Sequence, residues 1–336
     1  MKTFRLTRDD KDIKFAGGLI RVGELVAFPT ETVYGLGADA LNEEAVKSVY
    51  VAKGRPSDNP MIVHISKAED LPELIKGGKN ALGRDEIKLI EAFWPGPLTM
   101  VFPKSDIVPD VTTGGLDSVA VRMPSNEIAL RFIDAAGRPI AAPSANLSGK
   151  PSPTTAEDVL EDMDGKIAAV VMGDQCSVGI ESTVLDLTGA QPVILRPGII
   201  TPEWIGEILG KEISYDPALL TKPTDEENFK PKSPGMKYKH YAPKAAVMLI
   251  EGSNEAFEKK ASILGKLAHE KNMKTAVLNY CDSAKKAAHG LFADLRELDR
   301  QGFDLILIKS LEEVGLGFSV MNRMLKSAGY NIIKEQ

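Results

Sequence analysis

The sequence predicts an α/β protein that consists of a domain with a mixed twisted sheet, a linker, and a small Rossmann-like domain with a parallel sheet. The chain has 336 residues, which is too long for one ordinary hydrophobic core. Strand and helix patterns are interleaved without strict alternation in the first part and alternate strictly in the last part. We therefore expect domains at residues 1–212 and 245–336, joined by a linker at 213–244.

Short apolar runs and helical spacing predict the elements of the first domain. Apolar runs predict strands at residues 25–28, 61–65, 98–102, 118–123, 139–142, 167–172, 182–187 and 193–195. Helical spacing predicts helices at residues 12–21, 71–76, 85–93, 127–136 and 202–209, and after Asn42 and Thr154. Asn42 is a good N-cap, and Thr154 with Glu157 forms a predicted capping box. Gly35 and Gly37 predict a tight turn or a close approach to a ligand.

The linker and the last domain differ clearly in composition. Residues 215–244 contain five prolines, and the second half of this segment, KPKSPGMKYKHYAPK, holds five lysines and no acidic residue. This pattern predicts a linker that is either functional or a solvated tether. Beyond it, strands and helices alternate at residues 247–250, 255–270, 276–279, 291–301, 305–308 and 318–327. That βαβαβα order predicts a small parallel sheet.

The overall composition is that of a soluble globular protein. The formal net charge of −6 argues against a broad surface that coats nucleic acid. No stretch reaches the ~18 uninterrupted apolar residues of a membrane span, and the N-terminus lacks the apolar region of a secretory signal. Cys176 and Cys281 form neither a disulfide framework nor a metal-binding pair. We expect a cytoplasmic protein with no membrane partner and no resident metal site.

Cationic and hydroxyl side chains follow several predicted strands. Arg122 and Arg196 each end an apolar strand, and a buried arginine needs an anionic partner. That partner is either an internal carboxylate, in a salt bridge, or the carboxylate or phosphate of a ligand, which the planar fork of a guanidinium suits. Lys53 and Arg55 add two cations at the end of a helix, and the loop PSANLSGKPSPTT adds hydroxyls. Together these residues favour a polyanionic ligand.

Two other features of the sequence are weaker. The segment GLGADA at residues 35–40 matches a dinucleotide-binding pattern, but the next strand ends in His64-Ile65-Ser66 and not in an acidic residue. His64 is either a core residue or a residue that faces the pocket. The sequence has no P-loop, and its four histidines lack the spacing of metal ligands.

Seven segments, in order along the chain, carry a resemblance to a known family. They are FPTETVYGLGADA, KGRPSDNP, FWPGPLTMVF, VAVRMP, APSANLSGKPSPT, GIESTVLDLTG and ILRPG. Together they resemble the YrdC-type domain of threonylcarbamoyl-AMP synthase. The segment SPGMKYKHYAPK and the last domain are similar to the two-domain type of that enzyme, in which the linker folds over the site.

The resemblance implies a nucleotidyltransferase. It would convert L-threonine, bicarbonate or CO2, and ATP into L-threonylcarbamoyladenylate and pyrophosphate. Other tRNA-modifying proteins would then use this product to modify the adenosine beside the anticodon, so that contact with tRNA would be indirect. Mg²⁺ is expected to bridge the ATP phosphates, with the substrate supplying most of its ligands.

The resemblance also implies roles for individual residues. Threonine would be bound by Thr32, His64, Arg122, Ala142 and Ser182. ATP would be bound by Arg55, Asn59, Ser118, Ser144, Asn146, Ser152, Arg196 and Tyr241. Lys53 and Arg55 are the expected catalytic cations near the phosphates.

Two other functions compete with this interpretation. The first is an RNA-binding module without catalysis, which the net charge and the lack of basic stretches interleaved with aromatic residues disfavour. The second is a nicotinamide-dependent oxidoreductase, which depends on the GLGADA segment.

Overall fold

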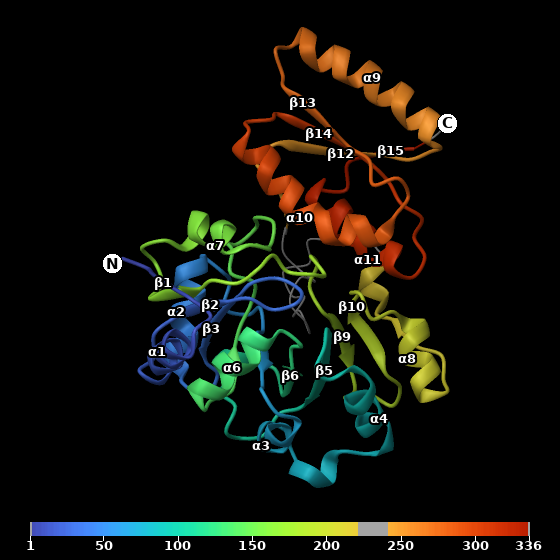
Figure 1. Cartoon of the computed structure of the whole chain (residues 1–336). Coiled ribbons are helices and arrows are strands. Elements are labelled where there is room, and N and C mark those ends of the chain that lie inside the picture. Colours follow the sequence, from blue (N-terminus) through green and yellow to red (C-terminus); the bar gives the residue numbers. More distant parts are fainter. Residues whose placement is uncertain (1, 221–240, 335–336) are drawn as a thin grey trace. The chain divides into compact units, whose positions relative to one another are not determined.

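The described part of the chain forms two compact units, each with its own sheet. The computed structural model describes residues 2–220 and 241–334 (Figure 1). The first unit comprises Met1–Ser148 and Ser152–Lys237, and the second comprises Gly149–Pro151 and Tyr238–Gln336. Most of the predicted linker, residues 221–240, lies outside the described residues.

The first unit is built on a mixed sheet, as predicted. Within the described residues the sheet has 11 strands in the order β1-β8-β2-β3-β7-β4-β6-β5-β9-β10-β11. Their bounds are β1 Phe4–Leu6, β2 Val26–Phe28, β3 Gly35–Asp39, β4 Ile62–His64, β5 Leu98–Pro103, β6 Ser118–Arg122, β7 Ile140–Ala141, β8 Ala169–Val171, β9 Thr183–Asp186, β10 Val193–Arg196 and β11 Ser214–Tyr215. The pairs β4–β6 and β5–β9 are parallel, whereas β2–β3, β3–β7 and β5–β6 are antiparallel.

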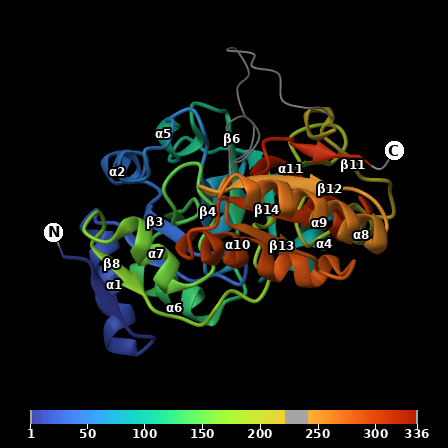
Figure 2. The same ribbon diagram turned by 90° about the horizontal axis from the view of Figure 1, so that it is seen from above.

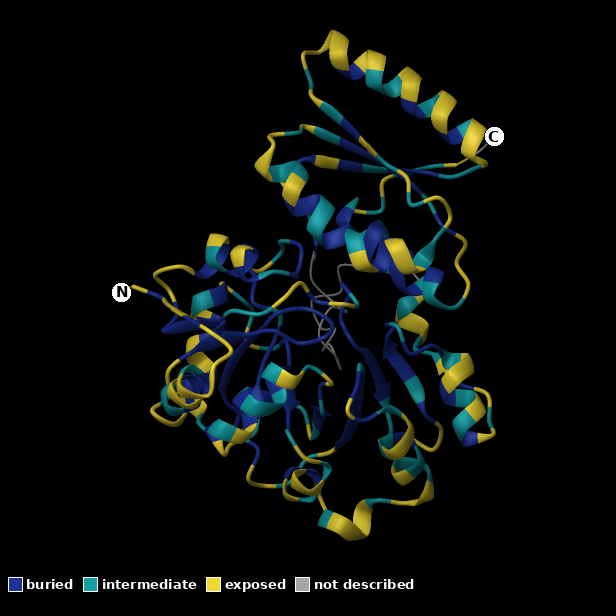
Figure 3. Cartoon of the chain, viewed as in Figure 1, coloured by how far each residue is buried: buried dark blue, intermediate teal, exposed yellow. Residues whose placement is uncertain are grey.

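Helices cover both faces of this sheet. They are α1 Asp10–Arg21, α2 Glu43–Lys53, α3 Leu71–Leu74, α4 Arg84–Phe93, α5 Asp110–Thr113, α6 Glu127–Ala136, α7 Ala156–Met163 and α8 Pro202–Leu209, with single 3₁₀ turns at Ala68–Asp70, Gly78–Ala81 and Pro217–Leu219. Val26 and Phe28 of β2 pack with α1 and α6, while Ala27 faces the core that contains α2. This alternation is the period of two expected for a strand between two layers. Figure 2 shows α1 with α6 and α2 with α5 on opposite sides of the sheet, and Figure 3 shows the buried strands between them.

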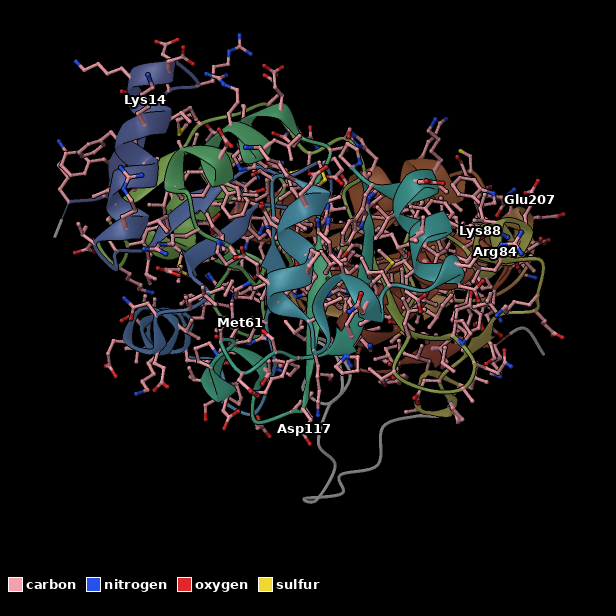
Figure 4. All side chains as sticks on the ribbon, turned by 90° about the horizontal axis from the view of Figure 1, so that it is seen from below. Lys14, Met61, Arg84, Lys88, Asp117 and Glu207 are labelled. Atoms are coloured by element: carbon pink, nitrogen blue, oxygen red, sulfur yellow. The ribbon has the colours of Figure 1, made fainter. Side chains whose placement is uncertain are left out.

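Helices α4 and α8 pack against each other beside the strands β9 and β10. The Nζ of Lys88 donates a hydrogen bond to the carbonyl of Ile208 at 3.4 Å, and Lys211 pairs with Asp85 at 2.7 Å. Figure 4 shows Arg84, Lys88 and Glu207 gathered at this edge. These partly buried contacts join α4 to the end of α8.

The predicted turn at Gly35 and Gly37 is wrong, because this segment is strand β3, antiparallel to β2. Neither glycine has a positive φ. A Cβ at Gly37 would lie 2.9 Å from Ile140 Cγ2 and 3.1 Å from Phe28 Cε1, so the glycine is needed for close packing of the sheet. A dinucleotide-binding loop requires a turn from strand into helix at this point. The structure therefore contradicts the oxidoreductase hypothesis.

Smaller corrections concern helix ends and short strands. The capping box of α7 is formed by Thr155 and Asp158, one residue later than predicted for Thr154 and Glu157. The sequence Thr112-Thr113-Gly114-Gly115 also suggests a glycine-rich loop, but its two threonines end the short helix α5, and Gly114 caps that helix. The strands β1 and β11 were not predicted, because their sequences, Phe-Arg-Leu and Ser-Tyr, contain no apolar run.

We expect Gly37→Ala to lower the free energy of unfolding by about 1–3 kcal/mol, because the added methyl overpacks the β2–β3–β7 interface. Chemical unfolding of the variant and the parent measures this difference. The matched control is Gly265→Ala in the second unit, where a Cβ would meet no described atom within 4 Å. That change should stabilise its helix by up to about 1 kcal/mol. Equal effects of the two substitutions would contradict the packing role of Gly37.

The second unit has the small parallel sheet that the sequence predicts. Its described strands are β12 Ala246–Ile250, β13 Thr275–Leu278, β14 Leu305–Lys309 and β15 Ile332–Ile333. Their order is β13-β14-β12-β15, and all the pairs are parallel. The helices are α9 Asn254–Glu270, α10 Ala284–Arg300 and α11 Leu316–Ser327. The structure thus confirms the βαβαβα order and adds β15.

Candidate functional site

The candidate site lies at one end of the first unit's sheet. The strands β4 and β6 are adjacent and parallel, and their register places His64 opposite Arg122. The loop between β2 and β3 reaches the same end, because Arg122 donates a hydrogen bond from Nη1 to Thr32 Oγ1 at 2.9 Å. Ser182 stands immediately before β9, which is parallel to β5. Because β5 is antiparallel to β6, the amino ends of β5 and β9 lie beside the carboxyl ends of β4 and β6, and α/β proteins bind ligands at such carboxyl ends.

Arg122 is buried and has a carboxylate neighbour that the sequence analysis did not assign. Its Nε donates to the carbonyl of Gly96 at 3.3 Å, and its Nη2 lies 2.7 Å from Glu31 Oε1. Both residues are less than one-tenth exposed. An internal salt bridge was one of the two alternatives for Arg122, and the structure shows that salt bridge.

The pair of Arg122 and Glu31 is close but incompletely satisfied. Neither carboxylate oxygen of Glu31, nor Nη2 of Arg122, makes a hydrogen bond of good geometry with the described part of the chain. Buried charged groups are normally fully hydrogen-bonded, because an unsatisfied one costs free energy. The arrangement therefore favours a ligand that carries both an acceptor for the guanidinium and a donor for the carboxylate.

Arg196 and Ser182 form a second buried pair at this end of the sheet. Arg196 donates from Nε to the carbonyl of Ser182 at 3.0 Å and from Nη2 to its hydroxyl at 3.0 Å. The Ser182 hydroxyl also lies 2.8 Å from the hydroxyl of Thr99. These contacts fix the Ser182 hydroxyl, so the structure brings together two residues that the resemblance assigned to different substrates.

His64 connects the two arginines electrostatically. Burial lowers the pKa of His64 to about 3, and the charges of Arg122 and, more weakly, of Arg196 add to this shift. Its Nδ1 lies 3.1 Å from the carbonyl of Ile62. The ring is therefore neutral near pH 7 and can donate or accept a hydrogen bond without carrying charge. Both arginines are therefore close enough to His64 to disfavour its protonation.

We expect His64 to make the folded state less stable as the pH falls below 6.5. Between pH 6.5 and about 3 the unfolded chain binds a proton that the folded chain excludes. Each pH unit in that window costs up to about 1.4 kcal/mol. Urea unfolding of the parent and of His64→Gln at pH 7, 6 and 5 measures the slope, with the exposed His269→Gln as the control. An unchanged slope in His64→Gln would contradict the burial of a neutral ring.

Lys53 organises the loop after β7. Lys53 is 2% exposed, and its ammonium group donates hydrogen bonds to the carbonyls of Ser144 and Asn146. In that loop the Ser144 hydroxyl donates to Asn146 Oδ1 at 2.6 Å. These contacts give Lys53 a positioning role, and its contact with phosphate stays a prediction. Farther along, Ser152 donates to Glu181 Oε1 at 2.6 Å, within the buried part of the same unit.

Arg55, Asn59 and Ser118 lie toward the other end of β4 and β6. Arg55 donates from Nη2 to the carbonyls of Asn59 at 3.3 Å and Pro60 at 3.0 Å. The Oδ1 of Asn59 is buried and makes no hydrogen bond with any residue in 2–220 or 241–334. Ser118 begins β6, which Arg122 ends, so about 13 Å of strand separates them. The structure therefore does not bring Ser118 next to Arg122.

The remaining predicted site residues are Ala142 and Tyr241. Ala142 is buried, and its amide donates to the carbonyl of Ile62, so it lines the β4–β7 junction. Tyr241 belongs to the second unit, where its ring stacks on Phe292 with a centroid distance of 5.0 Å. Its backbone has a φ of 65°, which is unusual for a tyrosine. Its contact with a nucleotide stays a prediction.

Sequence reasoning did not assign Glu31, Thr99 or Glu181 to the site. Glu31 carried a usable signal, because an acid between two threonines directly after a buried strand is costly to bury without a partner. Thr99 and Glu181 carried none, since their partners come from distant segments. In the described residues, no group of three or more His, Cys, Asp or Glu side chains could hold a metal ion. None of the helices in the described residues has the length and hydropathy of a membrane span.

Comparisons with known proteins cover almost the whole chain. A family model described as telomere recombination matches residues 18–198, and one described as threonylcarbamoyl-AMP synthase, C-terminal domain, matches residues 200–329. A curated threonylcarbamoyl-AMP synthase of Pyrococcus abyssi is 50% identical over 333 residues, which cover 96% of this chain and 95% of the relative. The enzyme of the same name from Bacillus subtilis is 43% identical over 346 residues, covering 99% and 97%.

A solved structure matches the fold across the full length. The crystal structure of P. abyssi Sua5 complexed with L-threonine has a TM-score of 0.92 and 46% identity, and the match covers 100% of each chain. That complex contains an amino acid, which carries a carboxylate and an ammonium group.

Proposed function

The chain belongs to the threonylcarbamoyl-AMP synthase family, and from that premise we propose that it makes L-threonylcarbamoyladenylate from L-threonine, bicarbonate or CO2, and ATP, with release of pyrophosphate. It is thus a nucleotidyltransferase. Its product supplies other proteins that modify the tRNA adenosine beside the anticodon, so we assign it to the cytoplasm and expect any tRNA contact to be indirect.

The observation that carries this proposal is the buried pair of Arg122 and Glu31 with its unmet hydrogen bonds. A threonine carboxylate can accept from the guanidinium of Arg122, which offers a planar fork of donors. The hydroxyls of Thr32 and Ser182 and the neutral ring of His64 supply uncharged partners for the rest of the amino acid. The site thus suits a small zwitterion with a hydroxyl group.

ATP would extend from this end of the sheet toward Arg55, Asn59 and Ser118. The strand β6 separates Ser118 from Arg122 by about 13 Å, a span that a threonine and a nucleotide joined end to end can bridge. The loop of Ser144 and Asn146, held by Lys53, lies beside β3 through the bridge between Gly35 and Ser144. Its hydroxyl and amide groups suit phosphate oxygens.

The reaction needs positioning more than covalent catalysis by the protein. The threonine amine forms a bond to the carbon of CO2 and loses a proton, which gives a carbamate. A carbamate oxygen then attacks the α-phosphorus in line, and pyrophosphate leaves. Fixed cationic and hydroxyl groups stabilise the charge that develops, and their fixed orientation lowers the entropic cost of the encounter.

Mg²⁺ is part of the proposal as a partner of ATP. The described residues offer no cluster of carboxylates for it, so the phosphate oxygens would supply most of its ligands, as is common for Mg²⁺. When bound, the ion neutralises phosphate charge. The residues of the chain orient the two substrates.

The test is to incubate the full chain with ATP, bicarbonate and each of the twenty amino acids, and to measure pyrophosphate release. We expect release with threonine, dependent on bicarbonate. Release without an amino acid, or equal release with all of them, would contradict the proposal. RNA binding that persists at high salt, without any pyrophosphate release, would instead favour the alternative of an RNA-binding module.

A further inference from the structure

The second unit contains a cavity of about 780 Å³ at the carboxyl ends of its strands. The loops after β12 and β14 form most of its wall, through residues 251–254 and 309–314. Asp282 and Ala284, at the start of α10, complete one side. A volume of this size is in the range of sites that bind small molecules.

The strand order places this cavity at a topological switch point. The strands β14 and β12 are neighbours in the order β13-β14-β12-β15. After β12 the chain passes through α9 to β13, beyond β14. After β14 it passes through α11 in the other direction to β15, beyond β12. The two connections run in opposite directions from adjacent strands. Accordingly α10 and α11 pack together, whereas α9 covers the other face of the sheet (Figure 1). Open parallel sheets bind ligands in the crevice where the connections diverge in this way.

A buried cation lines the cavity. Lys309 ends β14, is 5% exposed, and forms an ion pair with Asp282, whose side chain is 54% exposed. Lys309 also lowers the pKa of Asp282 through a hydrogen bond. A lysine is rarely buried at a cavity wall without an anion, because desolvating its charge is costly. Here a carboxylate from an exposed loop occupies the position that the phosphate or carboxylate of a ligand would take.

The other polar groups around the cavity are three carboxylates, two hydroxyls and one amide. Glu251, Glu312, Glu313, Ser253 and Ser310 line it, together with Asn254, whose Nδ2 donates to Asp282 Oδ2 at 3.2 Å. Carboxylates at strand ends accept hydrogen bonds from the hydroxyls of a sugar, as the acidic residue of a nucleotide-binding sheet does. Three glutamates would repel a ligand that is anionic throughout. A ligand with one anionic group and several hydroxyl groups could place the anionic group at Lys309 and the hydroxyl groups at the glutamates.

We propose that this cavity is a second ligand site, for a phosphate ester that carries hydroxyl groups, such as a phosphorylated sugar or a nucleotide. The phosphate binds Lys309 in place of the Asp282 carboxylate, and the hydroxyls donate to Glu251 and to the glutamates after β14. The site lies wholly within the second unit. It does not depend on the synthase activity proposed for the first unit.

The test is calorimetric titration of the full chain with ribose 5-phosphate, with inorganic phosphate and ribose as separate arms. We expect ribose 5-phosphate to bind more tightly than phosphate, and ribose to bind too weakly to measure. Lys309→Gln should weaken binding at least about tenfold, because a charged hydrogen bond is lost. Asp282→Asn should tighten it several-fold, because it removes the competing carboxylate and asparagine tolerates the φ of 57° at this position.

The opposite signs of these two effects distinguish a binding site from a structural ion pair. If Lys309→Gln does not fold, tighter binding by Asp282→Asn still supports the proposal, and unchanged or weaker binding overturns it. The exposed Lys259→Gln on α9 is the matched control and should bind like the parent. Loss of ribose 5-phosphate binding in Arg196→Ala would place the phosphate in the first unit and would also overturn the proposal.

Discussion

Replacing Arg122 with alanine should raise the threonine concentration needed for pyrophosphate release by about 30- to 1000-fold. The change removes a guanidinium from a site closed to solvent, and such a charged hydrogen-bond set contributes about 2–4 kcal/mol. Steady-state pyrophosphate release with varied threonine and saturating ATP measures the effect. The ATP requirement should change much less, since Arg122 lies at the opposite end of β6 from Ser118.

The control must separate lost binding from lost stability, because Arg122→Ala leaves the Glu31 carboxylate buried without a cation. The double variant Arg122→Ala with Glu31→Gln removes that charge, so it should recover stability in urea unfolding without recovering threonine use. Arg131→Ala is the matched surface control, since Arg131 pairs with the exposed Asp10. If the double variant regained normal threonine kinetics, Arg122 would be a structural residue.

Arg122 also shows what could be predicted from the sequence. A charged residue inside an apolar strand is visible in the sequence because burial of charge requires a partner. The identity of the partner was not visible, because Glu31 is 91 residues away and the register of β4, β6 and the β2–β3 loop brings them together. The sequence therefore predicted that Arg122 has an anionic partner, either an internal carboxylate or a ligand. The identity of the carboxylate depended on tertiary structure.

The GLGADA segment shows the reverse case. Glycine spacing predicted a turn, but Gly37 lies in strand β3, where it is needed because Ile140 and Phe28 occupy the space that a side chain would take. A local pattern cannot distinguish a glycine needed for φ from one needed for close packing. The second unit was easier to predict because its strict alternation of strand and helix allows few topologies.

Replacing Lys53 with methionine should lower kcat/KM for ATP by about 100-fold, with a smaller effect on threonine. Methionine keeps much of the side chain's length but leaves the carbonyls of Ser144 and Asn146 without their buried donor. Each unsatisfied buried group costs about 1–3 kcal/mol, which is enough to displace the loop. Steady-state kinetics with each substrate varied in turn, together with unfolding curves, measures both consequences.

Lys47→Met is the matched control, because Lys47 lies on the same helix and pairs with Glu43 and Glu44 at the surface. It should leave the kinetics unchanged. Lys53→Arg tests the mechanism further. If Lys53 acts by charge near the phosphates, arginine should retain much of the ATP activity. If it acts by holding two carbonyls, arginine should lower kcat/KM for ATP as methionine does, because Lys53 is 2% exposed and the bulkier guanidinium does not fit there. Normal ATP kinetics in Lys53→Met would contradict both roles.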